Sequence, residues 1–273
     1  MAESGWLTRS LEQPFPYLLN YQGRISNKLV KKAFLELIDC VENNNINPQY
    51  ILVELLIKVI ENQKDSKIKI TPLKFPENLS IKRILDVFEI QCTYNYRIFG
   101  GSKLPVLAFY AVYQILINEL KRYDKCSLSP LNSHTASDKS SKSSGDIEVF
   151  KKENLFETIE IKLDKKIDLN LLRIVSKKIF KFNPKRYYIL SFSGINKKEE
   201  DEILNLIDKI KKQHGCQIVA NGVLESLKYY LRLIENLDEF ISNYSKLIQE
   251  DTELKMVHKE KWNDLLMELN DEH

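Results

Sequence analysis

The chain has 273 residues, enough for one large domain or two modest ones, and 43% of them are hydrophobic, which supplies ample core. Its net charge of +3 is too small to identify a nucleic-acid-binding protein from total charge alone. No charge-free apolar stretch reaches membrane-spanning length, and the start of the chain lacks a basic head followed by an apolar run, so we expect no membrane segment and a cytoplasmic protein. The four cysteines and four histidines show neither disulfide-framework nor metal-ligand spacing, which predicts reduced thiols and no structural zinc.

Residues 1–101 are predicted to form a helical N-terminal region. Ser26 can cap a helix whose apolar residues run from Leu29 to Val41, Asn47-Pro48 can start a second helix, and Ser80 can start a third. A group of polar and aromatic residues then follows at 94–103. Within it, Arg97 and Lys103 are candidates for contacts with bases or phosphates, and packing beside a helix start is the alternative.

Residues 102–222 alternate between helical and strand patterns. Ser102 can cap an apolar helix that reaches about Tyr123, and two alternating strands then flank a polar turn. A helix over 169–182, a strand over 187–192, a helix over 199–213 and a short strand over 216–220 complete the region. This order predicts an α/β fold with a mixed, partly parallel sheet flanked by helices.

From Val223 onward the chain carries apolar residues at helical spacing, so residues 223–273 are predicted to form a helical C-terminal region. Such a stripe usually faces the protein's own core, and a dimerisation helix is the alternative use.

The two alternating strands carry the residues with the clearest chemical meaning. Asp146 lies on the first strand, and Glu160 and Lys162 lie on one face of the second. If the strands pair as an antiparallel hairpin, these three side chains converge. Two carboxylates with water and a phosphate oxygen suit Mg²⁺, so Asp146 and Glu160 are the predicted metal ligands and Lys162 the predicted contact to the scissile phosphate or to the attacking water.

An acid-x-Lys tripeptide is common in a chain with 41 Lys plus Arg and 38 Asp plus Glu, so an exposed charged hairpin is the alternative interpretation. Asp164 and Lys166 continue the same strand face and form a rival pair, although Asp164 begins a polar turn.

The segment before the first strand is rich in hydroxyls and lysines. Lys139, Ser140, Lys142 and Ser143 are candidate donors to DNA phosphates, and an ordinary low-complexity loop would have the same composition.

Asp146 and Glu160-Ile161-Lys162, with 13 residues between the two acids, resemble the motif of the PD-(D/E)xK nuclease superfamily, and within it the type II restriction endonucleases. Gly145 stands where that motif usually has proline. The resemblance implies a nuclease core over about residues 102–221, with Glu119 or Glu148 as a possible additional acid.

The same resemblance implies a hydrolase of a restriction-modification system, a Mg²⁺-dependent homodimer that cleaves duplex DNA at a specific short sequence. The alternatives are a DNA repair or junction-resolving nuclease with the same core, and a non-catalytic DNA-binding or helical interaction protein.

Overall fold

The computed structural model describes residues 17–22, 27–43, 46–65, 70–74, 79–131 and 143–271, and it divides the chain into two compact units, 1–67 and 68–273. The first unit contains helices α2 (Lys28–Asn43) and α3 (Pro48–Asp65). The side chain of Asn27 begins α2, because its Oδ1 accepts hydrogen bonds from the amides of Leu29 and Val30. The predicted cap, Ser26, lies outside the described residues.

A five-stranded mixed sheet organises the second unit, which makes the chain an α/β protein as the alternation predicted. The order across the sheet follows the chain: β1 (Cys126–Leu128), β2 (Ile147–Lys151), β3 (Asn154–Lys162), β4 (Arg186–Ser191) and β5 (Gln217–Gly222). Strand β2 runs antiparallel to both β1 and β3, whereas β3, β4 and β5 are mutually parallel. The short edge strand β1 was not predicted from the sequence.

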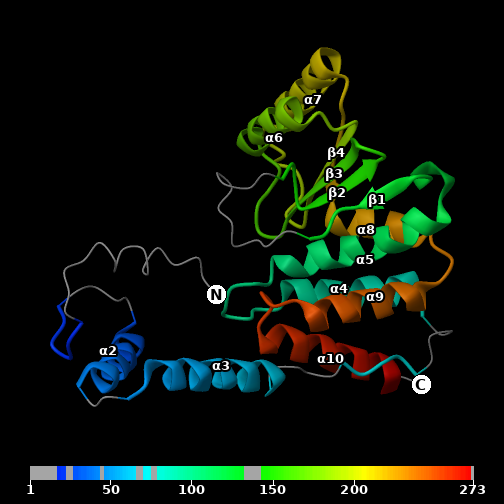
Figure 1. Ribbon diagram of the computed structural model, residues 1–273. Coiled ribbons are helices and arrows are strands. Elements are labelled where there is room, and N and C mark those ends of the chain that lie inside the picture. The colour runs from blue at the N-terminus through cyan, green and yellow to red at the C-terminus, as the bar shows by residue number, and fades with distance from the viewer. Residues whose placement is uncertain are drawn as a thin grey trace. The chain divides into compact units, whose positions relative to one another are not determined.

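Helices cover both faces of this sheet (Figure 1). Helices α6 (Leu169–Phe182) and α7 (Glu200–His214) lie on one face, and α5 (Lys103–Glu119) and α8 (Val223–Leu231) lie on the other. A short 3₁₀ turn, η2 (Lys121–Tyr123), links α5 to β1. Beyond α5 and α8 lie α4 (Ile81–Thr93), α9 (Leu237–Glu250) and α10 (Met256–Asp271). Helix α4 thus belongs with the sheet, and the division at 67/68 falls earlier in the chain than the predicted boundary at 101.

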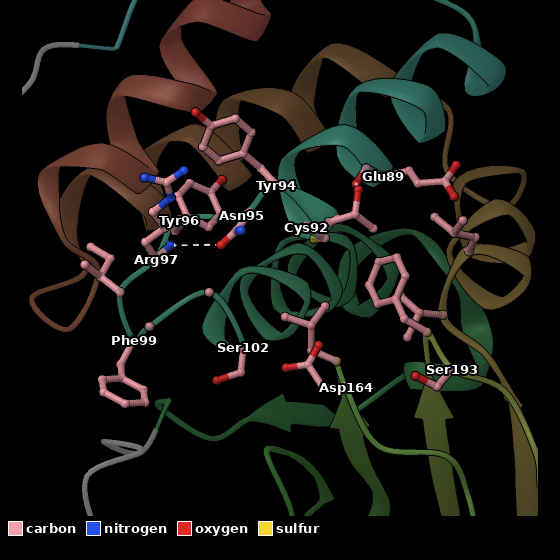
Figure 2. A pocket seen from close by; sticks show the side chains of 18 of the residues that line it. Glu89, Cys92, Tyr94, Asn95, Tyr96, Arg97, Phe99, Ser102, Asp164 and Ser193 are labelled. Atoms are coloured by element: carbon pink, nitrogen blue, oxygen red, sulfur yellow. Dashed lines mark hydrogen bonds between the residues drawn. The ribbon is translucent and has the colours of Figure 1, made fainter.

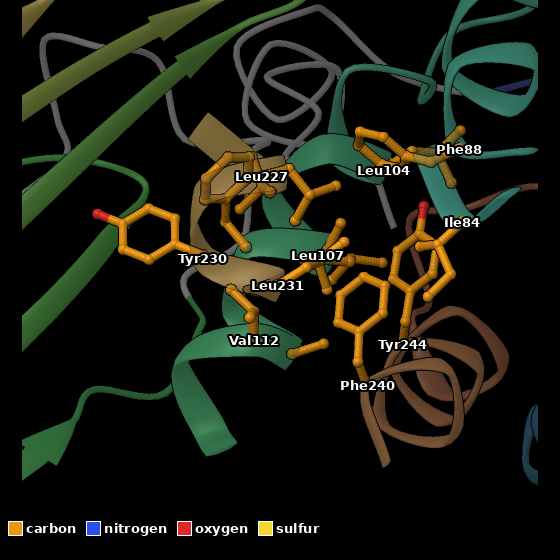
Figure 3. Packing of buried hydrophobic residues seen from close by; sticks show 14 of the residues in the cluster. Ile84, Phe88, Leu104, Leu107, Val112, Leu227, Tyr230, Leu231, Phe240 and Tyr244 are labelled. Atoms are coloured by element: carbon orange, nitrogen blue, oxygen red, sulfur yellow. The ribbon is translucent and has the colours of Figure 1, made fainter. Parts of the chain in front are cut away.

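Two apolar cores form, one on each side of the sheet. The smaller core joins β4 and β5 to α6 and α7, with Val175, Ile189 and Ile218 among its buried side chains. The larger core fills the space between the sheet and the helical layers, where Phe88, Leu107 and Tyr244 pack together (Figure 3). Tight burial of this kind is the main source of stability for such layers.

The apolar stripe of the C-terminal region faces this larger core, as predicted. Leu227, Leu231, Ile241 and Ile248 are buried, and the stripe is divided among α8, α9 and α10. Among the residues that the structure describes, no helix is long and apolar enough to cross a bilayer.

Helix starts test the local predictions directly. Ser80 caps α4 as predicted, since its hydroxyl accepts a hydrogen bond from the amide of Arg83 at 3.2 Å. The prediction for Ser102 is wrong, because that residue has helical backbone angles and makes no capping hydrogen bond.

Candidate active site

The register of the β2–β3 hairpin brings Asp146 and Glu160 to the same place. Ile147 pairs with Ile159 across the hairpin. Asp146 precedes Ile147 and Glu160 follows Ile159, so both acids lie on the face of the hairpin opposite to these two isoleucines. Asp146 also forms hydrogen bonds with β3 on both sides of Glu160. Its amide donates to the carbonyl of Ile159 at 2.9 Å, and its Oδ2 accepts from the amide of Ile161 at 2.7 Å. The predicted convergence of the two acids is confirmed.

Gly145 allows this close approach of the two strands. A Cβ atom at this position would lie 2.5 Å from Cγ2 of Thr158 and 2.9 Å from the carbonyl oxygen of Ile159. Both distances are shorter than van der Waals contact, so any side chain would push the entry of β2 away from β3. The glycine that departs from the superfamily's usual proline is therefore required by the packing at this point.

Glu160 is 5% exposed, and its carboxylate is surrounded by donors. Lys162 Nζ lies 2.5 Å from its Oε1, and Lys178 Nζ, from α6, donates to its Oε2 at 2.9 Å. The hydroxyl of Tyr187 lies 3.3 Å from the same Oε2 and 2.7 Å from the carbonyl oxygen of Ser144. The site is thus built from the hairpin, from β4 and from α6.

These surroundings move the pKa values of the two acids in opposite directions. Burial and the adjacent Glu160 carboxylate raise the pKa of Asp146 to about 7. Burial also acts to raise the pKa of Glu160, but the ammonium groups of Lys162 and Lys178 outweigh it and lower that pKa below its ordinary value. Near neutral pH, Glu160 is ionised and Asp146 is poised between its two forms.

The donor set fits a hard divalent cation such as Mg²⁺. The half-buried carboxylate of Asp146, just before β2, and the buried carboxylate of Glu160, on β3, lie beside each other, and their mutual repulsion is what a divalent cation would relieve. In the part of the chain that the structure describes, no group of three or more His, Cys, Asp or Glu side chains gathers around a possible metal position, so Asp146 and Glu160 would be two protein ligands with water and phosphate oxygens supplying the rest. Both oxygens of Glu160 contact lysines, and a metal would have to replace one of them.

Two residues of this site were not singled out from the sequence. Tyr187 was predicted only as part of the strand over 187–192, and Lys178 only as part of the helix over 169–182. A signal for Lys178 did exist, because it lies on the apolar stripe of α6, seven residues after Leu171 and three after Val175. A lysine that interrupts a buried stripe needs a nearby acid, and Glu160 is that acid.

The two candidates for an additional acid, Glu119 and Glu148, form hydrogen bonds with other parts of the chain. Glu148 shares the polar face of β2, but its Oε1 accepts hydrogen bonds from the amide of Ser144 at 2.6 Å and from the hydroxyl of Ser143 at 3.3 Å. Glu119 is at the end of α5, where its Oε2 accepts from the amide of Glu235. Glu119 is therefore not part of the Asp146–Glu160 site in this structure, and Glu148 stabilises the turn that leads into β2.

Of the predicted DNA contacts, Lys103 requires a correction. Its side chain is buried and forms ion pairs with Asp251, at 3.9 Å, and Glu253, at 3.5 Å, so it is a structural cation and not a surface contact. The hydroxyl of Ser143 donates to the carbonyl of Gly145 at 2.5 Å and thus supports the turn before Asp146. Lys139, Ser140 and Lys142 lie outside the described residues.

Arg97 is exposed beside a cavity of about 830 Å³ at the carboxyl ends of β3 and β4 (Figure 2). Its backbone adopts a left-handed conformation with φ of 53°, and its amide donates to Oδ1 of Asn95 at 3.2 Å. The cavity is also lined by Asp164 and two glutamates, so its floor is not a basic surface for phosphates. Arg97 remains a candidate contact at the rim. The rival pair, Asp164 and Lys166, lies beyond the end of β3, and both residues are exposed.

Strand β3 also carries the buried carboxylate of Glu157, which points to the opposite face of the sheet from Glu160. Its oxygens accept hydrogen bonds from the hydroxyls of Tyr113 and Tyr123 at 3.1 and 3.0 Å, and it forms an ion pair with Arg122. This network ties α5 and η2 to the sheet. Glu157 is therefore satisfied by structural partners and is separate from the site at Glu160.

The chain matches no protein-family model, and no curated protein is significantly similar to it. The function of the site therefore has to be inferred from its geometry.

Proposed function

We propose that this chain is a Mg²⁺-dependent endodeoxyribonuclease, most closely resembling the type II restriction endonucleases, that hydrolyses phosphodiester bonds of duplex DNA. The observation that supports the proposal is that Asp146 lies beside Glu160 on the hairpin, while lysines from β3 and α6 lie within hydrogen-bonding distance of the Glu160 carboxylate. A structural ion pair would need one acid and one base. Here a second acid, the half-buried Asp146, with its pKa raised to about 7, adds repulsion that folding alone does not require.

Each residue has a distinct part in this proposal. Asp146 and Glu160 would hold the cation, which when bound polarises the phosphoryl group and lowers the pKa of a water molecule. Lys162 is one-quarter exposed at its side chain, so its ammonium can leave Glu160 and approach a phosphate oxygen or the attacking water. Lys178 is less exposed and holds the second oxygen of Glu160, which makes it a positioning residue for that carboxylate.

The surroundings of the pair limit how the site can move. Tyr187 is fully buried, and its hydroxyl connects the Glu160 carboxylate to the backbone just before Asp146. The hydroxyls of Ser144 and Thr158 lie 2.7 Å apart and connect the same two segments. These contacts preorganise Asp146, at the start of β2, and Glu160, within β3, which is the arrangement that precise metal-assisted chemistry needs.

Digestion of a panel of plasmid and phage DNAs by the full-length protein tests the proposal. Discrete fragments in Mg²⁺ that disappear when a chelator is added are the expected result and identify site-specific cleavage. A smear would instead indicate a nuclease of lower specificity, and selective cutting of branched substrates added to the panel would indicate a junction-resolving enzyme. DNA that stays intact in both Mg²⁺ and Mn²⁺ would leave the non-catalytic interpretation.

A further inference from the structure

The cavity at the carboxyl ends of β3 and β4 lies at the same edge of the sheet as the candidate active site. Lys162 is the last residue of β3, and Leu163 and Asp164, which follow it directly, line the cavity. Asp146 precedes β2, which runs antiparallel to β3, so it lies at this edge as well. DNA held at Asp146 and Lys162 would therefore lie beside the cavity.

The loop 94–102, which joins α4 to α5, forms another side of the cavity and holds one aromatic ring in solvent (Figure 2). Phe99 is 97% exposed, the highest value among the large hydrophobic side chains that the structure describes, and Tyr94 and Ile98 on the same loop are about half exposed. A phenylalanine ring stabilises a fold by leaving water, so this position of Phe99 contributes nothing to folding. The ring is instead available to a binding partner.

Contacts with α4 and α10 fix the backbone of this loop. The hydroxyl of Tyr96 donates to the carbonyl of Gln91 at 2.8 Å, and its ring centroid lies 4.3 Å from that of His258 on α10. Gly100 has a φ of 122°, and a Cβ atom there would lie 3.1 Å from Cε1 of His258, so the loop passes close to α10. Phe99 is thus held in a defined place beside the strand ends.

The lining of the cavity favours a flat, neutral group with hydrogen-bond donors over a phosphate. Glu89, Asp164 and Glu225 line it, with Arg97 as the only cation among the described lining residues, and Phe192 supplies an aromatic wall. In the part of the chain that the structure describes, the side chains of Glu89 and Asp164 form no hydrogen bond or ion pair. Carboxylates accept hydrogen bonds from amino groups, which adenine, cytosine and guanine carry and thymine lacks. The volume of about 830 Å³ lies within the range of about 300–1,000 Å³ that is usual for small-molecule sites, so a single base fits.

We propose that this cavity accepts one adenine, cytosine or guanine base of the bound duplex and that Phe99 enters the base stack at the position that the base leaves. A base inside an intact duplex cannot reach such a cavity, so it has to turn out of the stack. An apolar side chain inserted between base pairs replaces part of the stacking that is lost. This inference rests on the proposed nuclease function, since it assigns a further contact of the same bound DNA.

Chemical probing of unpaired bases tests the inference on a DNA fragment that the wild type cuts in Mg²⁺, with Ca²⁺ in place of Mg²⁺ during probing. The base left without its partner becomes reactive: thymine toward permanganate, guanine toward kethoxal, and cytosine toward chloroacetaldehyde. We expect one such base close to the cleavage position when the protein is bound. If the reactive base is instead an adenine, the displaced base is thymine, and the assignment of an amino-bearing base to the cavity is overturned.

Substitutions of Phe99 test its part separately. Phe99→Ala is expected to weaken DNA binding about tenfold and to lower the reactivity of the unpaired base at least about fivefold, whereas Phe99→Trp should stay within about threefold of the wild type. Phe180→Ala is the matched control, because Phe180 is 54% exposed on α6, contacts the ring of His214 and does not line this cavity. Both phenylalanines are exposed, so unfolding in urea should show little change in stability for either alanine variant.

The outcomes separate this inference from the proposed nuclease function. Cleavage of DNA by a wild type that leaves every base paired, or a Phe99→Ala variant that binds DNA and exposes the same base as the wild type, overturns this inference alone. If the wild type binds DNA without cutting it, the nuclease proposal fails, and the same probing of the bound fragment still decides this inference. A wild type that neither binds nor cuts DNA in Mg²⁺ or Mn²⁺ overturns both.

Discussion

Replacing Asp146 with asparagine should stabilise the metal-free protein at alkaline pH while removing a predicted metal ligand. The folded-state pKa of Asp146 is about 7, above its ordinary value of 3.8. Between these two values the folded protein holds a proton that the unfolded chain releases, so the stability falls as the pH rises through this window, and the full penalty is present above pH 7. Asparagine cannot ionise and therefore escapes the penalty.

The size of the effect follows from the pKa difference. One pKa unit corresponds to about 1.4 kcal/mol, so the penalty reaches about 4 kcal/mol above pH 7, of which about 2 to 3 kcal/mol develops between pH 5 and pH 8.5. The oxygen of asparagine can still accept the hydrogen bond that Oδ2 of Asp146 accepts from the amide of Ile161, so the variant keeps this contact with β3.

Urea unfolding at several pH values, with a chelator present, measures this difference. The free energy of unfolding of Asp146→Asn minus that of the wild type should grow by about 2 to 3 kcal/mol from pH 5 to pH 8.5. Asp164→Asn is the matched control, because Asp164 is exposed just beyond the same strand, and it should show no such growth. A difference that does not change with pH, or a variant less stable than the wild type at pH 8.5, would show that Asp146 and Glu160 do not repel each other in the folded protein.

Three further variants test the parts of the site separately. Lys162→Ala should lower the single-turnover cleavage rate at saturating protein by about 100-fold or more, whereas Lys166→Ala should weaken only DNA binding; the opposite outcome would make Asp164-Lys165-Lys166 the true motif. Lys178→Met frees one oxygen of Glu160, so the Mg²⁺ concentration that half-saturates cleavage should fall several-fold even as the maximal rate declines, and a rise in that concentration would contradict the position of Lys178. Gly145→Ala should destabilise the fold by about 1 to 3 kcal/mol in urea unfolding, since the backbone of β3 blocks the new Cβ, and a neutral substitution would show that the strands can separate there at no cost.

The sequence predicted the hairpin well because strand alternation is a local property. Once Ile147 and Ile159 are assigned to the buried face, the positions of Asp146 and Glu160 follow from the period of two, and the register of the structure agrees. The later helices and parallel strands were also predictable, since Asn183-Pro184 and Gly215 mark their ends and the apolar periods change there.

What could not be predicted depends on contacts between segments far apart in the chain. Lys178 reaches Glu160 only because α6 packs over the polar side of the hairpin, and Lys103 is neutralised by acids about 150 residues later. The residues near Lys103 in the sequence do not indicate whether its side chain is a buried cation or a DNA contact. The exposed surface of α3 was equally hidden, because an apolar helix in a sequence gives no indication of whether its own chain covers it.

If Asp146 and Glu160 act together as the metal site of a DNA-cleaving enzyme, Asp146→Asn should fail to cleave duplex DNA that the wild type cleaves under the same conditions. Because the variant is expected to be at least as stable as the wild type near pH 8, a loss of activity cannot be attributed to unfolding. We expect discrete Mg²⁺-dependent fragments from the wild type and uncut DNA from Asp146→Asn, with DNA binding retained. Equal cleavage by both proteins would show that Asp146 is not an essential metal ligand, and no cleavage by the wild type in Mg²⁺ or Mn²⁺ would rule out the proposed nuclease activity.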